Sequence, residues 1–279
     1  MKWLAVLCCL LPVSAAAQTI TAVNGPLASM ARTLAGDAAT VIYPVPDGTD
    51  PALWRPSVEQ ISDIQNSDLI LLNGADFARW AAKTSLPRAR TVVTSRAFED
   101  TYITIAQGLT HSHGADGEHS HDGIAPNTWL DFAQAAQQAE AIAKGLKRVL
   151  PAESAQIDRR LAEMTEALMA LDTRAKTLAG TRVVVAHGGL EYFTRAYALD
   201  ATEIAWTPGQ APSAEDLARL DAAFGAQPPD IILWQTPPHP QAQAAAKARG
   251  LVSIVFDPGT DNLDRFVERM AENLAALAR

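Results

Sequence analysis

The chain has 279 residues, of which 48% are hydrophobic, and its 31 acidic and 23 basic residues give a net charge of −8 at pH 7. A chain of this length exceeds what one compact core usually takes, so we expect two lobes. The acidic balance argues against nucleic acid or an anionic membrane surface as a partner, because both require a basic surface.

The N-terminus has the pattern of an export signal. Met1-Lys2 gives a short positive start, residues 3–13 form an apolar run, and residues 14–17 supply the small side chains that a signal peptidase requires. The apolar run is shorter than the roughly 20 residues of a membrane-spanning helix. We therefore predict a signal peptide over residues 1–17, cleaved between Ala17 and Gln18, and export from the cytoplasm.

Both cysteines, Cys8 and Cys9, lie within the predicted signal peptide. The mature chain would then contain no thiol, so a metal site would have to be built from His, Asp, Glu and water. Such ligands suit zinc or manganese better than copper(I) or an iron–sulfur cluster. Lipidation of Cys8 or Cys9 is an alternative, although Leu7 before Cys8 stands where lipoprotein signals usually place a small residue.

Short, β-branched, nearly continuous apolar runs predict parallel strands that are covered on both faces. Amphipathic stretches with apolar residues three and four positions apart predict helices between the first of these strands. We expect strands at residues 19–23, 68–72, 182–186, 230–234 and 251–256, and helices at residues 27–35 and 57–66.

Residues 108–123, in the run GLTHSHGADGEHSHDG, interrupt this alternation. The segment has almost no apolar residue, which predicts a mobile surface loop that is neither helix nor strand. Neutral imidazole binds zinc, copper and nickel, so we interpret the loop as an auxiliary metal-collecting segment of modest affinity. The alternative is a solvated loop of biased composition. Its candidate ligands are His111, His113, His119 and His121.

Helix-forming residues predominate from Trp129 to Gly180, and Pro151 divides this region. A helix over residues 154–178, ending just before a strand, would bridge two lobes. We therefore predict an α/β fold of two lobes, each an open, mainly parallel sheet flanked by helices, with a ligand cleft between the lobes. The expected units are an N-terminal lobe at residues 18–150, a bridging helix at 151–180 and a C-terminal lobe at 181–279.

Two candidate ligands follow directly on predicted strands. His187 comes after the strand at 182–186, and Asp257 comes after the strand at 251–256. Both side chains are therefore expected at the carboxyl edge of one sheet, where ligands bind in open α/β folds. The alternatives are a buried core histidine and a turn aspartate before Pro258-Gly259.

Three further polar residues near these strands are weaker candidates. Glu191 and Glu203 can be helix-face charges, and His239 in a proline-rich run is expected to cap or decorate a loop. The sequence contains no nucleophile elbow, Walker loop or dinucleotide fingerprint, so we do not expect an enzyme.

Several runs of this sequence resemble the zinc-specific branch of the periplasmic metal-binding components of zinc and manganese ABC importers. The family's opening strand and helix and its four ligand loops correspond to AVNGPLASMARTLAGDAATV, GTDPALWRPSVEQISDIQNSDLILLNGADFARW, APNTWLDFAQA, AHGGLEYFTRAYAL and VFDPGTDNLDRFVERMAENL. A His-rich insertion before the second ligand loop is also typical of that branch. The resemblance implies a periplasmic monomer that captures zinc, manganese or another divalent transition metal and delivers it to an inner-membrane ABC permease.

The ligand positions implied by the resemblance are only partly kept. The family usually has Asp-Pro-His in its first and second loops, whereas this chain has Ala52 and Asn127 at the histidine positions. His187 and Asp257 match the third and fourth ligands. The implied metal site is therefore His187 and Asp257 with Asn127 as a weaker oxygen donor, fewer than the four ligands of a closed zinc site.

Several interpretations of this loss stay open. In the first, histidines of the loop complete the site. In the second, a metal complex fills the vacant positions with its own atoms. In the third, the cleft holds a non-metal solute, with Trp54 and Arg55 as new contacts. A periplasmic metal buffer or chaperone that uses the His-rich loop is the main functional alternative. A metal-dependent hydrolase with Glu191 as its base is a more distant one.

Overall fold

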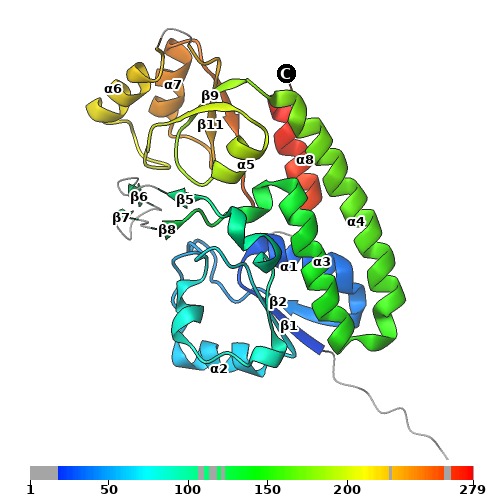
Figure 1. Ribbon diagram of the computed structural model, residues 1–279. Coiled ribbons are helices and arrows are strands. Elements are labelled where there is room, and N and C mark those ends of the chain that lie inside the picture. Colours follow the sequence, from blue (N-terminus) through cyan, green and yellow to red (C-terminus); the bar gives the residue numbers. More distant parts are fainter. Residues whose placement is uncertain are drawn as a thin grey trace, which may run out of the picture.

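The computed structural model describes residues 18–105, 110–112, 118–120, 123–225, 228–260 and 265–278. Two four-stranded sheets organise these residues, one below and one above in Figure 1. The strand orders are β2-β1-β3-β4 and β10-β9-β11-β12, and all neighbours within each sheet are parallel. The predicted α/β architecture of two parallel sheets is therefore confirmed, and the two sheets share one topology.

The first sheet combines two predicted central strands, β1 and β3, with two edge strands that were not predicted, β2 and β4. Its central strands carry the buried apolar runs, whereas the edge strand β2 alternates between half-buried and exposed residues. The strands are β1 (Gln18–Ala22), β2 (Ala39–Ile42), β3 (Leu69–Leu72) and β4 (Thr91–Val93). Its helices are α1 (Gly25–Ala35) and α2 (Val58–Asn66).

Local capping explains where these two helices begin. The Asn24 side chain accepts a hydrogen bond from the Leu27 N–H at the start of α1. Ser57 and Gln60 form a capping box at the start of α2, each side chain bonding the other's backbone N–H. The predicted starts were therefore close, because the capping residues are visible in the sequence.

The second sheet repeats the arrangement with β9 (Arg182–Val185), β10 (Asp200–Glu203), β11 (Ile231–Trp234) and β12 (Val252–Val255). Its helices are α5 (Glu191–Ala196), α6 (Ala214–Ala222) and α7 (Pro240–Ala248). The His239 side chain caps α7 by accepting the Gln241 N–H, which confirms the capping interpretation of this histidine. The edge strand β10 was not predicted, because none of its residues is buried.

Two long helices, α3 (Phe132–Val149) and α4 (Ser154–Ala175), run side by side along one side of the molecule (Figure 1). The helix expected at 154–178 ends in a 3-10 turn, Lys176–Leu178. The C-terminal helix α8 (Phe266–Leu277) packs against both α4 and α1, so the chain's last helix reaches back to its first. The other 3-10 turns of the described residues are Gly36–Ala38, Arg79–Lys83, Arg88–Arg90, Arg96–Thr101, Thr128–Leu130 and Pro151–Glu153.

The two lobes are joined by a shared core and by hydrogen bonds. One buried apolar cluster contains side chains of both sheets, including Ile20 of β1 and Val185 of β9. The Trp129 indole N–H donates to the Pro258 carbonyl at 2.8 Å, and the Phe132 N–H donates to the Tyr197 hydroxyl at 2.9 Å. These contacts connect the lobes through rigid, buried groups.

The His-rich segment contains two short antiparallel strand pairs. β5 (Thr104–Ile105) pairs with β8 (Gly123–Ile124), and β6 (Thr110–Ser112) pairs with β7 (Glu118–Ser120), with His111 opposite His119. The expectation of no strand here is wrong over these residues, because a hairpin needs only backbone hydrogen bonds and no buried apolar face. His113 and His121 lie outside the described residues.

Within the described part of the chain, no helix combines the length and the apolar character that a membrane span requires. The predicted signal peptide, residues 1–17, lies outside that part.

Candidate functional site

A cleft of about 410 Å³ lies where the carboxyl ends of the two sheets face each other. Its volume is in the range of about 300–1,000 Å³ typical of small-molecule sites. One half is lined by Asp50, Pro51, Ala52, Phe77, Ile105, Pro126 and Asn127, and the other by Gly188, Gly189, Glu191, Pro208, Gln235 and Asp257, among others. The ligand cleft predicted between the lobes is present.

Ala52 lines the N-terminal half and offers the cleft only a methyl group. Its backbone N–H donates to Asp50 Oδ1 at 2.8 Å, which closes a tight turn. Trp54, proposed from the sequence as a new contact, is instead buried and packs edge-on against Trp80, with 6.0 Å between the ring centroids. Neither Trp54 nor Arg55 is among the described residues that line the cleft.

Asn127 connects the two halves of the cleft. Its side chain is buried, and Nδ2 donates to the Gly189 carbonyl at 2.8 Å. Gly189 has a φ of +106°, and a Cβ there would lie 2.9 Å from Gln235 Nε2 and 3.0 Å from Asn127 Nδ2. A larger residue at position 189 would therefore be strained by its backbone conformation and would have to displace these two amides, and the Asn127 hydrogen bond links the two halves of the cleft.

His187 follows β9, as predicted, but it lies behind the cleft. Only 3% of the residue is exposed, and it borders an inner cavity of about 20 Å³ that also touches Trp206, Trp234 and His239. Gln235 lines both the cleft and this cavity, and its Nε2 donates to the carbonyls of His187 and Gly188. The Gln235 side chain therefore lies where the inner cavity meets the cleft.

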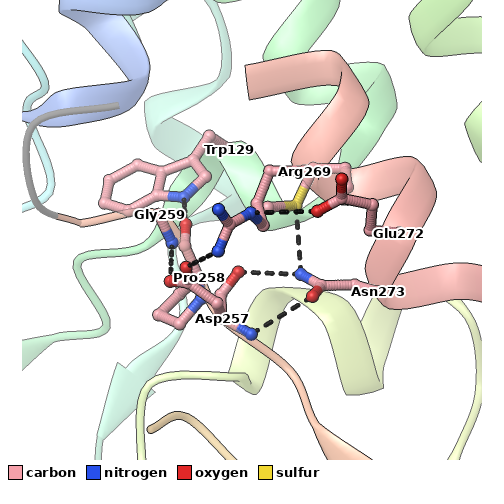
Figure 2. Close-up of polar contacts among 8 residues, drawn as sticks. Trp129, Asp257, Pro258, Gly259, Arg269, Glu272 and Asn273 are labelled. Atoms are coloured by element: carbon pink, nitrogen blue, oxygen red, sulfur yellow. Dashed lines mark hydrogen bonds and ion pairs between the residues drawn. The ribbon is translucent and has the colours of Figure 1, made fainter. Parts of the chain in front are cut away.

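Asp257 lines the cleft, and protein donors engage both of its carboxylate oxygens. Oδ1 accepts the Gly259 N–H at 2.8 Å, and Oδ2 accepts Arg269 Nη1 at 2.5 Å. Figure 2 shows Arg269 between Asp257 and Glu272, while Asn273 bonds the backbone N–H and carbonyl of Asp257. The predicted fourth ligand is present, but it is held in a salt bridge from α8.

Glu191 lines the same half of the cleft and begins α5, four residues after His187. Its Oε1 accepts the Gly189 N–H at 2.7 Å, while Oε2 is buried and has no hydrogen-bond partner among the residues that the structure describes. Burial raises the pKa of Glu191 above its ordinary value. Burial, and then the nearby charge of Glu191, raise the pKa of Glu203 to about 7.

Sequence reasoning ranked one of these cleft residues too low and missed another. Glu191 was named only as a weaker candidate, although its position two residues after Gly189 was a signal for a site residue. Gln235 follows directly on β11, and the strand-end rule that identified His187 would also have found it.

The donors at this site fit a divalent cation only in part. An imidazole and several carboxylates lie in the C-terminal half, but no group of three or more His, Cys, Asp or Glu side chains converges on one point among the described residues. His111 and His119, the two described loop histidines, are backbone partners in the pairing of β6 with β7.

Comparison with known proteins gives a family match over almost the whole chain. The model of the family described as "Zinc-uptake complex component A periplasmic" (ZnuA) matches residues 20–279. The zinc-binding lipoprotein AdcA of Streptococcus pneumoniae is 25% identical over 270 residues, covering 90% of this chain and 53% of the relative. The high-affinity zinc uptake system protein ZnuA of Bacillus subtilis is 26% identical over 212 residues, covering 70% of this chain and 63% of the relative. The chain thus spans about half to two thirds of these relatives.

Solved structures share the fold. The metal-dependent lipoprotein YcdH from Bacillus subtilis superposes with a TM-score of 0.77 at 19% identity, covering 93% of this chain and 97% of the other. Zn(II)-bound AdcA from Streptococcus pneumoniae gives 0.74 at 21% identity, over 94% of this chain and 57% of the other. FpvC from Pseudomonas aeruginosa in complex with Mn²⁺ gives 0.72 at 24% identity, over 95% and 98%.

Proposed function

The chain belongs to the family of periplasmic zinc-uptake complex components A, and on that premise we propose that it is a solute-binding protein that captures zinc, or a similar divalent transition metal, for an ABC permease. In this proposal the protein is exported, works in the periplasm as a monomer and performs no chemistry on its cargo. The relatives named for zinc or manganese binding support this choice of cargo.

The charge of the cleft is the observation that carries the proposal. Asp50, Glu191 and Asp257 line it, and none of the described residues that line it is Lys or Arg. Such a lining attracts a cation, and neutral imidazole with carboxylate oxygens is a donor set that zinc and manganese accept. His187 and Asp257, with Asn127 as a weaker donor, stay the predicted ligands of this cargo, and the four loop histidines stay predicted auxiliary ligands.

The number of protein ligands determines how tightly the cleft binds its cargo and how readily it releases it. With fewer protein ligands than a closed zinc site has, water or other small ligands complete the coordination shell. Binding is therefore expected to be weaker than in a site of four protein ligands. Such a cargo dissociates more readily, which suits transfer to a partner in the membrane.

Zinc titration calorimetry of the mature protein, with and without residues 111–121, tests the proposal. We expect one binding phase that His187→Ala removes and a weaker, multi-site phase that only the loop deletion removes. If neither form binds zinc, cobalt, manganese or nickel, the cargo is not a metal and the proposal fails.

A metal buffer or chaperone is the second candidate. The observation that favours it is the hairpin register, which places His111 opposite His119 in the His-rich segment. In this case all measurable zinc binding would be micromolar and would disappear with residues 111–121, while His187→Ala would leave it intact. The same titration separates the two functions.

A further inference from the structure

We propose that Glu191, rather than Asp257, supplies the carboxylate that contacts the captured cation in the C-terminal half of the cleft. The inference rests on the proposed function and names the residue that determines binding within that site. It follows from how the protein already uses the oxygens of these two carboxylates.

Asp257 is poorly placed to accept a cation. Gly259 N–H and Arg269 Nη1 already engage its two oxygens at 2.8 and 2.5 Å. A metal ion on Oδ2 would have to displace the guanidinium or lie beside its positive charge, and like charges at such short range repel. Arg269 is also fixed from its other side by Glu272 Oε2 at 3.3 Å. The arginine therefore competes with the cation for Asp257.

Glu191 has the opposite arrangement. The Gly189 N–H bonds Oε1 at 2.7 Å and orients the carboxylate, while Oε2 is buried and has no hydrogen-bond partner within the described part of the chain. A buried carboxylate oxygen without a partner carries a desolvation cost that a bound cation removes. The nearby Glu203 adds to this cost, because two buried carboxylates repel each other.

The position of Glu191 also connects it to both halves of the cleft. Gly189 donates its N–H to Glu191 and accepts Asn127 Nδ2 on its carbonyl at 2.8 Å. The same turn begins at His187, whose carbonyl accepts Gln235 Nε2 at 3.1 Å. The short segment 187–191 thus carries both the His187 imidazole and the Glu191 carboxylate. The Asn127 amide bonds this segment from the opposite lobe. Such a mixed nitrogen and oxygen set suits Zn²⁺ or Mn²⁺.

Zinc affinities of Glu191→Gln and Asp257→Asn, measured by competition with a chromophoric chelator at one pH, test the inference. Both changes are isosteric and remove one charge. We expect Glu191→Gln to weaken Zn²⁺ binding at least about tenfold, the equivalent of one charged contact, and Asp257→Asn to weaken it less. Glu163→Gln, on the exposed face of α4, is the matched control and should not change the affinity.

Two measurements distinguish the loss of a metal ligand from a loss of zinc affinity caused by misfolding. Thermal unfolding should show that metal-free Glu191→Gln is at least as stable as the parent, since the change removes a buried charge. The visible spectrum of bound Co²⁺ should change in Glu191→Gln more than in Asp257→Asn, because only a direct ligand alters the cobalt site strongly.

The outcomes are distinguishable. If the parent binds no divalent metal, the proposed function itself fails. If the parent binds zinc and Asp257→Asn weakens binding as much as Glu191→Gln or more, the assignment of Glu191 is overturned and the proposed function stands.

Discussion

The two halves of the cleft have the same scaffold and different chemistry. Each half consists of loops at the carboxyl ends of a four-stranded parallel sheet, and both sheets have the same strand order. The N-terminal half presents the Ala52 methyl, the Asn127 amide and one carboxylate, Asp50, whereas the C-terminal half presents two carboxylates with an imidazole behind them. Topology therefore determines where a ligand binds, and single side chains determine what binds.

The halves also differ in how they hold their polar groups. Asn127 bonds the opposite lobe through its amide nitrogen, so this side chain connects the two halves of the cleft. In the C-terminal half, Arg269 neutralises Asp257, while one Glu191 oxygen has no hydrogen-bond partner among the described residues. The C-terminal half thus contains one carboxylate paired with an arginine, Asp257, and one with an oxygen that lacks a partner among the described residues, Glu191.

The largest expected effect comes from removing the imidazole of the C-terminal half. We expect His187→Ala to weaken Zn²⁺ binding at least about a hundredfold, because loss of even an outer-shell partner typically costs 10–100-fold. Competition titration measures the effect, and circular dichroism controls for the cavity left by this buried side chain. An unchanged affinity would place the ion outside this half of the cleft.

The contact between the halves can be broken at Gly189. Gly189→Ala forces a side chain into a positive-φ position and between two amides, and we expect it to cost about 1–3 kcal/mol of unfolding free energy. Urea denaturation measures this loss.

Gly48→Ala is the matched control for this change. Gly48 also has a positive φ, of +73°, but no atom of the described residues lies within 4 Å of where its Cβ would stand. Only the backbone cost of about 1 kcal/mol is therefore expected there. Equal losses in the two variants would show that the two amides exert no constraint.

The difference in metal donors between the two halves can be reduced by placing an imidazole in the N-terminal half. Ala52→His adds a donor to the cleft lining, and we expect Zn²⁺ to bind about tenfold more tightly, or about 1.4 kcal/mol. The same titration on Ala52→Gln, which adds bulk without an imidazole, is the control. If both variants bind zinc equally, ligand count does not limit the affinity of this cleft.

The smallest effect is expected from pH, through Glu203. Its pKa is raised to about 7 in the folded protein from an ordinary value of 4.5, so between these pH values the folded state binds more protons than the unfolded state. Stability of the metal-free protein should therefore fall as the pH rises from about 4.5 to about 7, by about 1 kcal/mol after allowance for solvent screening. The difference in urea midpoint between the parent and Glu203→Gln, measured at several pH values, isolates the contribution of Glu203 to stability. A difference that does not vary with pH would contradict it.

Much of the fold was predictable because its signals are local. β1, β3 and β9 each contain three consecutive buried residues. The capping box formed by Ser57 and Gln60 marks the start of α2. The edge strands β2, β4 and β10 were not predicted, because none of their residues is buried and they therefore lack that apolar pattern. The lobe boundaries at 150/151 and 180/181, the cleavage site and the metal ligands stay predictions.

The sequence by itself determined that two parallel sheets would meet at a cleft, and that His187 and Asp257 would follow strands of the second sheet. Only the tertiary structure decided what those residues do. Asn127 bonds Gly189 across 62 positions, and Arg269 reaches Asp257 from the next helix. Strand ends depend on neighbours in sequence, whereas the partner of a buried polar atom depends on which distant segment packs against it. The amino-acid sequence therefore predicts the position of the ligand cleft more clearly than the atoms that contact the ligand.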